Sequence, residues 1–494
     1  MSEGRRMKSN SGNSTDKTKG RKRNSKLDAI LKLIAFIYAV ITIIFYISVI
    51  KMDMLPGMYV TIFTVAEIIF TIAMVIGLVK RHRTYTLNIV CLLVIIFISS
   101  IYIYVTNYAL ATSNFLDNIL KEVSETEEYY VVVKKDSNYS KIEDIKNQDV
   151  YLFQAEDDIK SEVGSKISIT LKSKNSLQEL GESLINNNIE AILISSTQYD
   201  ILDEEVKNFK ANTKIIYTAT HKIKVKTEVV NANAKNTIEN GIFNVYISGI
   251  DTSGSISNVA RSDANIIATV NTKTHEVLLT SIPRDYYVTL HSKGAKDKLT
   301  HSGIYGISET VSTVEDLLNI DINYYVRVNF TTVIKVVDTL GGIDVYSDYD
   351  FTGNNGTHFT KGYNHVNGED ALSFSRERYS FTDGDNQRVK NQQHVIEAIM
   401  KKVLNSTTLL TKYTSILNSL EGSFQTNIKQ EEISSLVKGQ LNDMSSWTIK
   451  NNSLTGTGAT STTYSMGSQK LYVMIPSSTS VQEAKEKIAD VMGE

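Results

Sequence analysis

The 494-residue chain contains one cysteine and three prolines. Cys91 lies in an apolar run, and an intramolecular disulfide is excluded because the chain has no second cysteine. The formal net charge is −2, so no global basic field favours a nucleic-acid partner. The chain also lacks a G-x-S-x-G nucleophile motif and a Walker loop, and its histidines show no metal-ligand spacing. These absences argue against a disulfide-stapled domain, an α/β-hydrolase and a P-loop enzyme.

Three long apolar runs occupy residues 30–50, 58–79 and 87–108. Each run is long enough to cross a bilayer. Three runs in succession, joined by short loops, argue against buried core helices and against a cleaved signal peptide. Glu67 interrupts the second run, and it either faces another helix or reaches the membrane interface.

Lysine and arginine flank these runs unevenly. The segment KTKGRKRNSK precedes the first run and KRHR fills residues 80–83, whereas the first loop, KMDMLPG, is nearly neutral. Because positive loops stay in the cytoplasm, we expect a multi-pass cell-membrane protein with its N-terminus inside and everything after about residue 110 outside. The predicted parts are a basic cytoplasmic tail (1–28), three transmembrane helices (29–110), an accessory domain (111–230) and a larger domain (241–494).

The accessory segment reads as a small α/β unit. Short strands are predicted at YYVVVKK, VYLFQ, IEAILIS and TKIIYTA, and a helix at SLQELGESLINNN. The unit loosely resembles half of a solute-binding domain, but its sequence shows no ligand chemistry. We therefore prefer a spacer or interaction module over a small-molecule binder. Residues 225–240 read as a linker.

The larger domain alternates apolar strands and helices. Strands are predicted at 243–250, 265–270 and 276–282, and a helix over 331–340 ends at two glycines. This order predicts a mixed β-sheet with helices on both faces. If 265–270 pairs with 277–282 through a turn at 271–276, Asp263 falls opposite Arg284.

Arginines gather in the stretch FSRERYSFTDGDNQRVKNQQHV. In an extended segment Arg376 and Arg378 share a face and Glu377 points away, while Arg388 opens a helical stripe with Gln392. Inward guanidinium groups need an anion, which is either a carboxylate of the chain or a ligand. The carboxylate reading pairs them with Glu369, Asp370 or Glu377, and pairs Arg284 with Asp263 or Asp285.

Two aspartates also lie near strand ends. Asp251 and Asp263 serve either in turns and salt bridges or as ligands of a hard cation. Taken together, two aspartates, four arginines and a helix N-terminus favour a pyrophosphate with Mg²⁺.

Five segments appear in the order typical of one known family: GIDTSGSISNVARSDANIIATVN, LLTSIPRDYYV, KLTHSGIYG, VNFTTVIKVVDTLGGIDV and VNGEDALSFSRERYSFTDGDNQRVKNQQHVI. They resemble the LytR-CpsA-Psr family over roughly residues 241–440. The succession of three spans, an accessory domain and this domain looks like the members encoded at streptococcal capsule loci. The resemblance implies a membrane-bound phosphotransferase that moves a glycopolymer, here capsular polysaccharide, from a polyprenyl-pyrophosphate carrier to peptidoglycan.

The resemblance also assigns residues. It implies that Asp251 and Asp263 bind Mg²⁺ and that Asp263, Arg284 and Arg378 are catalytic. The residues implied to hold the pyrophosphate are Arg284, Lys298, Arg376, Arg378, Arg388 and Gln392. Other capsule-assembly membrane proteins are candidate partners.

A charged head with a polyprenyl tail needs an apolar pocket beside the arginines. We expect its lining from the inner faces of two helices: Val333, Ile334, Val337, Ile396 and Ile399. The alternative for each of these residues is an ordinary packed core. Two other functions stay open: hydrolysis of a lipid pyrophosphate by water, and non-catalytic regulation of capsule synthesis.

Overall fold

The computed structural model describes residues 25–494 apart from 54–55, 81–85, 120–123, 156, 225–236, 251–255, 257–258, 383, 405–411, 413–414, 417–418, 421–422, 444 and 494. Asp251 and most of the expected linker therefore lie outside the described residues. The chain divides into a helical unit, made of Met1–Lys51 and Gly57–Ala109, and an α/β unit, made of Met52–Pro56 and Leu110–Glu494.

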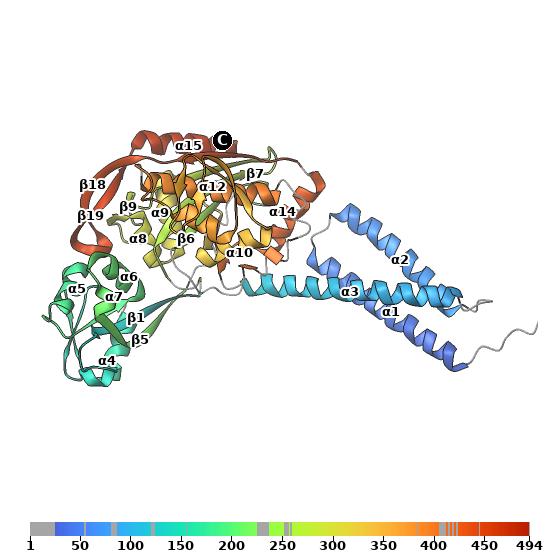
Figure 1. The fold of residues 1–494 in the computed structure, drawn as a ribbon, viewed down its shortest axis with the longest axis horizontal. Coiled ribbons are helices and arrows are strands. Elements are labelled where there is room, and N and C mark those ends of the chain that lie inside the picture. The colour runs from blue at the N-terminus through green and yellow to red at the C-terminus, as the bar shows by residue number, and fades with distance from the viewer. Residues whose placement is uncertain are drawn as a thin grey trace, which may run out of the picture. The chain divides into compact units, whose positions relative to one another are not determined.

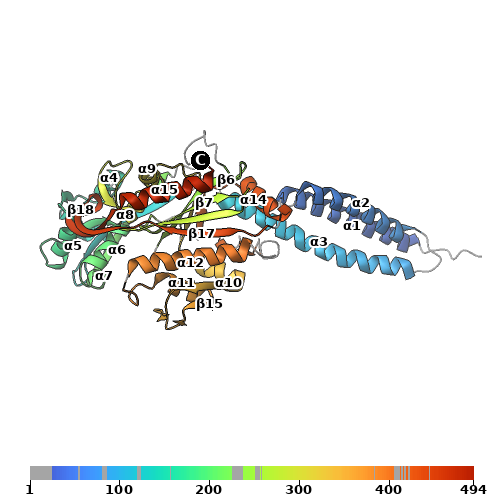
Figure 2. The ribbon, with the colours of Figure 1, turned by 90° about the horizontal axis from the view of Figure 1, so that it is seen from above.

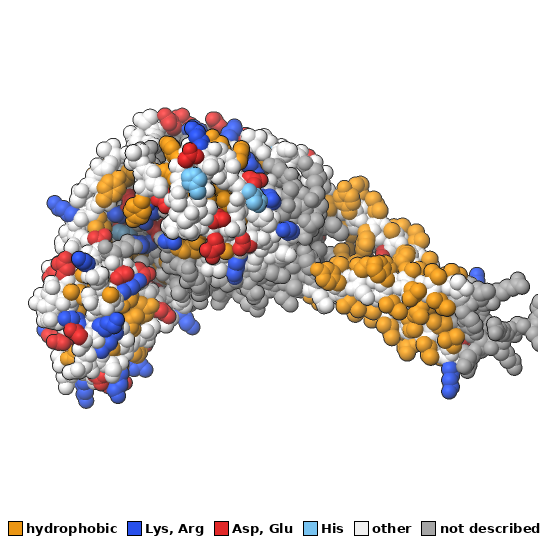
Figure 3. Space-filling model, in the orientation of Figure 1, with side chains coloured by type: hydrophobic (Ala, Val, Ile, Leu, Met, Phe, Trp, Pro, Cys, Tyr) orange, Lys and Arg blue, Asp and Glu red, His pale blue; other side chains and the backbone are white. Residues whose placement is uncertain are grey.

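The helical unit consists of α1 (Ser25–Met52), α2 (Gly57–Val79) and the start of α3 (Thr86–Ile119). All three helices are long and apolar enough to span a membrane, as expected. Their outer faces are covered by apolar side chains (Figure 3), such as Phe36 at 67% exposure. Buried Glu67 accepts hydrogen bonds from the Tyr102 hydroxyl of α3 at 2.6 Å and from Thr71 at 3.1 Å. Glu67 thus faces another helix, which was one of its two predicted placements.

The accessory domain is a five-stranded sheet in the order β3-β2-β4-β1-β5. Strands β2, β3 and β4 are parallel, and β1 pairs antiparallel with β4 and β5. Helix α4 packs on one face of the sheet, and α5 and α6 pack on the other. The elements (Figure 1) are β1 (Ser124–Lys134), η1 (Ile142–Ile145), β2 (Asp149–Leu152), α4 (Asp157–Lys166), β3 (Thr170–Ser173), α5 (Leu177–Ile185), β4 (Ala191–Ser195), α6 (Ser196–Glu205), α7 (Phe209–Asn212) and β5 (Thr213–Lys224).

The larger domain is built on a six-stranded sheet in the order β16-β11-β6-β7-β8-β17. Pairs β6–β11 and β8–β17 are parallel and the other pairs are antiparallel, so the predicted mixed sheet is confirmed. The strands are β6 (Ile242–Ile250), β7 (Ser262–Asn271), β8 (Glu276–Ile282), β11 (Tyr324–Val328), β16 (Phe424–Thr426) and β17 (Thr448–Ser453).

Helices cover both faces of this sheet (Figure 2). Because side chains alternate along a strand, Leu278 packs with α9 (Ile307–Leu318) and α15 (Ser478–Met492) on one face. Its neighbour Leu279 packs on the opposite face with α12 (Asp385–Leu404). Helices α10 (Phe330–Leu340) and α11 (Gly368–Arg376) share a second core with α12. This arrangement aims the N-terminal turns of α10 and α12 toward the ends of β6 and β11.

Short elements complete the larger domain. Beside the sheet lies a hairpin formed by β18 (Gly456–Thr463) and β19 (Gly467–Pro476), joined by η3 (Tyr464–Met466). The others are β9 (Tyr287–Thr289), β10 (Lys296–Lys298), α8 (Leu299–Ser302), η2 (Gly303–Tyr305), β12 (Ile343–Ser347), β13 (Phe351–Thr352), β14 (His358–Phe359), β15 (Gly362–Val366) and α14 (Gln430–Asp443).

The hairpin ties the two domains of the α/β unit together. Met466 is fully buried in the core that α5 and α6 form with the accessory sheet. The Ser468 N–H donates to the Asn175 carbonyl at 3.3 Å, and the Gln469 side chain donates to the Glu205 carboxylate at 3.1 Å. The accessory domain is therefore packed against the larger domain through a shared apolar core, with polar contacts around it.

Candidate functional site

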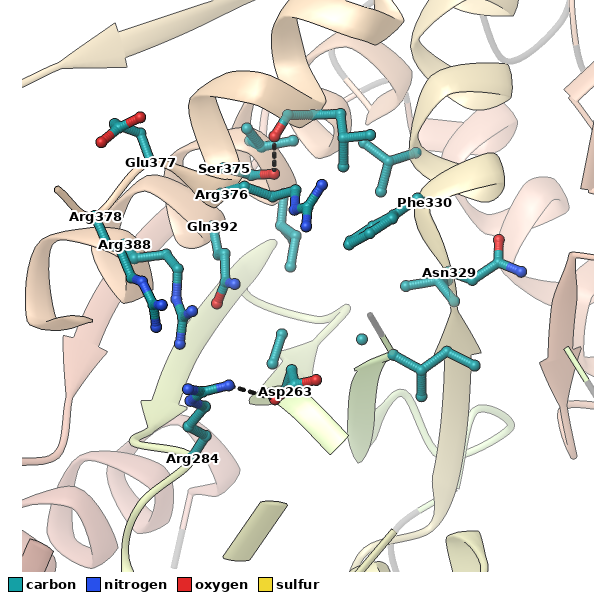
Figure 4. A pocket seen from close by; sticks show the side chains of 18 of the residues that line it. Asp263, Arg284, Asn329, Phe330, Ser375, Arg376, Glu377, Arg378, Arg388 and Gln392 are labelled. Carbon is teal, nitrogen blue, oxygen red and sulfur yellow. Dashed lines mark hydrogen bonds and ion pairs between the residues drawn. The ribbon is translucent and has the colours of Figure 1, made fainter. Parts of the chain in front are cut away.

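A cavity of about 560 Å³ opens at the carboxyl ends of β6, β8 and β11, where ligands bind in open α/β sheets. We call it the arginine pocket (Figure 4). It is lined by Ile247, Gly249, Ile250, Arg261, Asp263, Ala264, Arg284, Val328, Asn329, Phe330, Val333, Asn354, Leu372, Ser375, Arg376, Glu377, Arg378, Tyr379, Arg388, Gln392, Val395 and Ile396.

The β7–β8 hairpin brings Asp263 and Arg284 together. Asn265 pairs with Ile282, so the expected register is confirmed, and the Arg284 Nη1 lies 2.7 Å from the Asp263 Oδ1. The Thr300 hydroxyl donates to the same oxygen at 3.2 Å. Burial disfavours the ionised carboxyl, but Arg261, Arg284 and Arg388 outweigh burial and hold the pKa of Asp263 below its usual value. Asp263 is therefore a carboxylate at neutral pH.

Lys298 does not line the pocket. Its ammonium group lies 2.9 Å from the Asp285 Oδ1, and the Arg284 Nε lies 3.8 Å from the other oxygen of Asp285. Arg284 thus contacts both carboxylates that the sequence offered as partners. Lys298 therefore lies one contact behind the pocket wall, through Asp285, and its expected contact with a pyrophosphate stays a prediction.

The expectation that Arg376 and Arg378 leave a strand is wrong. Residues 368–376 form α11, which Asn367 caps by accepting a hydrogen bond from the Asp370 N–H. The helix buries Ala371 and Phe374 three residues apart. An apolar run this short does not distinguish a strand from a helix. Arg376 is the last residue of α11.

Both arginines nevertheless face the pocket, and Glu377 points away from it (Figure 4). The Arg376 guanidinium stacks over the Phe330 ring at 4.2 Å, and that of Arg378 lies over the Tyr379 ring at 4.7 Å. The Glu377 carboxylate accepts hydrogen bonds from the Tyr379 and Ser380 N–H groups, at 2.8 and 2.9 Å. Glu377 therefore shapes the loop that carries Arg378.

Arg388 and Gln392 lie four residues apart on α12 and both line the pocket. Arg388 is in the first turn of the helix, as predicted, and its N–H bonds to the Gly384 carbonyl at 3.2 Å. An anion near this turn gains from the helix dipole. Lys390, two residues on, is exposed on another face of the helix.

The opposite wall is apolar. Val333 and Ile396 line it as expected, together with Phe330 and Val395. Ile334, Val337 and Ile399 are not among the lining residues. Val337 is fully buried in the core shared by α10, α11 and α12, and Ile399 packs against that core, so the alternative of a packed core holds for both. The Ile334 backbone lies against Gly368, where an added Cβ would meet the Ile334 carbonyl at 2.4 Å.

Arg261 was missed in the sequence because the segment around it reads as a turn. Its signal was the spacing to Asp263, since residues two apart in extended chain share a face. Among the residues that the structure describes, the lining contains five arginines and two carboxylates, an excess of three positive charges next to an apolar wall. Within the described ranges, no cluster of three or more His, Cys, Asp or Glu side chains could hold a metal ion.

The pocket thus combines cationic side chains with an apolar wall on an α/β domain. Residues 205–488 match the LytR_cpsA_psr family. This is more than half of the sequence, and the chain belongs to the LytR-CpsA-Psr family. The predicted family and fold class are confirmed.

Curated relatives include two proteins named polyisoprenyl-teichoic acid–peptidoglycan teichoic acid transferase TagU. The Bacillus mycoides protein is 32% identical over 264 residues, 53% of this chain and 81% of the relative. The Bacillus cereus protein is 36% identical over 199 residues, 40% of this chain and 64% of the relative. The match thus spans less than two thirds of the second relative. Among solved structures, Bacillus subtilis TagU is 31% identical with a TM-score of 0.40, covering 51% of this chain and 97% of that one.

Proposed function

We propose that the protein is a membrane-bound phosphotransferase that moves a glycopolymer from a polyprenyl-pyrophosphate carrier to peptidoglycan. The observation that carries this proposal is the arginine pocket, in which five arginines and Asp263 face an apolar wall. A pyrophosphate fits the arginines because guanidinium forks bind two oxygens each and stay charged. The first part of a polyprenyl chain fits the wall formed by Phe330, Val333, Val395 and Ile396.

In the proposed reaction an acceptor hydroxyl attacks the phosphorus that carries the sugar. The new P–O bond forms while the bond to the bridging oxygen breaks. The lipid phosphate leaves with the electron pair, and the proton of the acceptor hydroxyl passes to that phosphate or to water. Phosphoryl transfer depends mainly on positioning and on stabilising the charge that moves to the leaving group. We assign this role to Arg376 at the end of α11, Arg378 in the loop that follows and Arg388 in α12, which all border the same cavity.

Arg284 has a second role in this scheme. It pairs with Asp263 at 2.7 Å and lies 3.8 Å from Asp285, and these two carboxylates hold its guanidinium group at the pocket wall. The Thr300 hydroxyl fixes the same Asp263 oxygen. These contacts orient the carboxylate before the substrate binds.

We propose Mg²⁺ as the cofactor, held by Asp263, by Asp251 from outside the described residues, and by phosphate oxygens. A carboxylate has two oxygens with about four lone-pair sites in total, so the contact with Arg284 leaves capacity for a hard cation. When bound, the ion would stabilise charge on the phosphate oxygens. Arginine charges already balance a pyrophosphate, so we expect metal removal to lower the transfer rate more than the affinity for the donor.

We further propose that the N-terminus is cytoplasmic and the α/β unit extracellular. The support is the Lys and Arg distribution around the three candidate spans. A protease added to wall-stripped cells should then cleave the chain beyond residue 110 and leave the N-terminal tail intact. Protection of the α/β unit would contradict this topology.

Two polymers are candidates for the cargo. The relatives' names point to teichoic acid. We favour capsular polysaccharide, because the three spans and the accessory domain resemble members encoded at capsule loci. Providing each polymer on its lipid carrier to the same enzyme preparation would separate the two.

The decisive experiment is a transfer assay with the full-length protein in detergent, a polyprenyl-pyrophosphate saccharide and peptidoglycan. The expected product is a saccharide joined to peptidoglycan by a phosphodiester, formed by the wild type and lost in Arg376→Ala. Saccharide phosphate released into solution, without attachment to peptidoglycan, would instead indicate a hydrolase. Full polymer attachment in cells that express only the variant would indicate a non-catalytic regulator.

A further inference from the structure

A second cavity, of about 490 Å³, lies where the accessory domain meets the larger domain. We call it the junction pocket. The accessory side of its lining is Glu127, Tyr129, Leu152, Phe153, Gln154, Ala155, Lys160, Ser173, Ser195, Gln198, Ile201 and His221. The larger domain closes it with Ser292, Lys293, Ile304, Tyr305, Tyr464 and Ser465. Its size is in the range of about 300–1,000 Å³ that is typical of small-molecule sites.

The junction pocket lies at the topological switch point of the accessory sheet. The loop after β2 leads to α4 on one face, and the neighbouring strand β4 leads to α6 on the other face. Open α/β sheets bind ligands in this crevice, outside the carboxyl ends of the strands. Phe153 and Gln154 follow β2, Ser173 ends β3 and Ser195 ends β4, so the carboxyl ends of all three parallel strands reach the pocket.

The lining combines ring faces with neutral hydrogen-bonding groups. Phe153, Tyr305 and Tyr464 contribute aromatic rings, and Gln154 and Gln198 contribute amides. A sugar ring needs this combination, because its C–H faces are apolar while its hydroxyl groups both donate and accept hydrogen bonds. Serine hydroxyls at 173 and 292 extend the polar part, whereas the Ser195 hydroxyl accepts from the Gln198 N–H and the Ser465 hydroxyl donates to Asp297.

The charges disfavour a phosphate as occupant. Glu127 is only 5% exposed and lies opposite His221 across the β1–β5 pair. A phosphate beside this carboxylate would be repelled. Lys160 and Lys293 are at least partly exposed and line opposite sides of the pocket, and the Lys293 ammonium lies 4.8 Å from the Tyr305 ring. Lys160 already pairs with Asp157 at 3.0 Å, so Lys293 is the cation that suits a single carboxylate on the ligand, as an acidic sugar carries.

A short segment connects the two pockets. Thr300 in α8 contacts Asp263 of the arginine pocket, and Tyr305 at the end of η2 lines the junction pocket. Five residues at helical rise separate their backbones by roughly 10 Å. Buried Asp297 holds this segment to η3, because it accepts hydrogen bonds from the Ser465 N–H at 2.8 Å and pairs with His301 at 2.6 Å.

We propose that the junction pocket binds a short saccharide, with a preference for one acidic sugar. Two sources share this chemistry: the glycan of the acceptor and the polymer being transferred. Assigning the bound saccharide to the acceptor or to the polymer rests on the proposed transfer reaction. Binding of a saccharide in the junction pocket does not depend on that reaction. The accessory domain would then be a binding module, which the sequence alone did not indicate.

The test is calorimetric titration of the full-length protein in detergent with three probes. These are the muramyl disaccharide GlcNAc–MurNAc, neutral diacetylchitobiose, and an oligosaccharide released from the cell's own wall polymer. Binding of the muramyl disaccharide assigns the acceptor, and binding of the polymer fragment alone assigns the cargo. If none of the three binds at millimolar concentration, the proposal is overturned.

The variants are chosen to leave the fold intact. Tyr464→Ala removes a ring that is 38% exposed, and we expect it to weaken saccharide binding by about tenfold or more. Tyr472→Ala, on the same hairpin and 52% exposed, is the matched control and should not change the affinity. Lys293 is exposed, and Lys293→Ala should weaken binding of the acidic disaccharide more than binding of diacetylchitobiose. Wild-type affinity in both pocket variants would overturn the assignment.

Arg378→Ala separates this proposal from the transferase. Saccharide binding should persist in that variant even though transfer is lost. If the wild type binds saccharide but transfers nothing, the proposed function fails and the junction pocket stands. If it transfers polymer but binds no saccharide, the junction pocket fails alone.

Discussion

Replacing Arg378 by alanine removes one cation from the arginine pocket and few contacts from the fold. The guanidinium lies over the Tyr379 ring, and its Nη2 is 2.5 Å from the Tyr379 hydroxyl. It makes no ion pair with any carboxylate in the part of the chain that the structure describes. An exposed cation–π contact contributes about 0.5–1 kcal/mol and a hydrogen bond about as much. The melting temperature should therefore fall by only a few degrees, about 2–4 °C for each kcal/mol in a domain of this size class.

The expected effect on the reaction is much larger. A donor aimed at charge that develops in the transition state contributes about 3–4 kcal/mol, which is roughly a hundred- to a thousand-fold in rate. Arg378→Ala should lose this stabilisation of the transition state. Its cost to the stability of the fold is partly offset, because the repulsion between Arg378 and the other arginines is removed. Arg378→Lys keeps the charge but loses the two-pronged fork. We expect it to fall between alanine and the wild type in rate.

The measurements are polymer transfer and thermal melting on the same purified variants. Lys390→Ala is the charge control, because it removes an exposed cation from α12 outside the pocket. Tyr379→Phe removes the hydroxyl that contacts Arg378 and keeps the ring. Lys390→Ala should transfer polymer at close to the wild-type rate, whereas Tyr379→Phe should cost less activity than Arg378→Ala because the guanidinium group stays in the pocket. Full activity of the double variant Arg376→Ala/Arg378→Ala would refute the reasoning, since these arginines would then serve only the fold.

Three other predictions concern the carboxylates. Asp263→Ala should abolish transfer in a protein that stays folded but melts at a lower temperature, because Arg284 then keeps only its contact with Asp285. Because the pKa of Asp263 is depressed, wild-type transfer should show no loss from protonation of Asp263 above about pH 5. Thr300→Val should lower the rate with less effect on donor affinity, because Asp263 loses one of the two contacts that orient it. Asp297→Asn should destabilise the protein by about 1.5–3 kcal/mol at neutral pH. Burial opposes ionisation of Asp297, but His301 and Ser465 outweigh burial and lower its pKa. The ionised carboxylate therefore stabilises the fold above the pKa of aspartate in the unfolded chain, which is near 4. The difference in melting temperature between the wild type and Asp297→Asn should shrink as the pH falls below that value.

The arginine pocket was predictable where local pattern determines geometry. A turn of fixed length between two apolar strands determined the register, and the register placed Asp263 beside Arg284. Helical spacing placed Arg388 and Gln392 on one face of α12. In both cases the contact depends on residues that are close in sequence or joined by a short hairpin.

The wrong predictions concern segments whose structure depends on tertiary packing. The apolar run around Phe374 is too short to show whether its hydrophobic residues repeat with a strand or a helix period. It forms α11 because Ala371 and Phe374 bury one face of a helix. Val337 and Val333 lie four residues apart on α10, yet Val337 is fully buried in the core and Val333 lines the pocket. Only the positions of α11 and α12 determine which of the two reaches the cavity. The junction pocket depends on strand order and on a hairpin more than 250 residues away, neither of which a local pattern contains.

The balance of charge indicates a ligand more clearly than any single arginine does. In a structural network each inward cation has its own acid, as Arg284 has Asp263 and Asp285. Two of the acids that the sequence offered as partners make other contacts: Glu377 accepts two backbone N–H groups, and Asp370 accepts from Asn355 and Thr357. Guanidinium groups that border one partly desolvated space repel one another, and an anion bound among them would be attracted to each. Binding of an anionic head group relieves that repulsion, and the adjacent apolar wall limits the fitting anions to those that carry a hydrophobic chain.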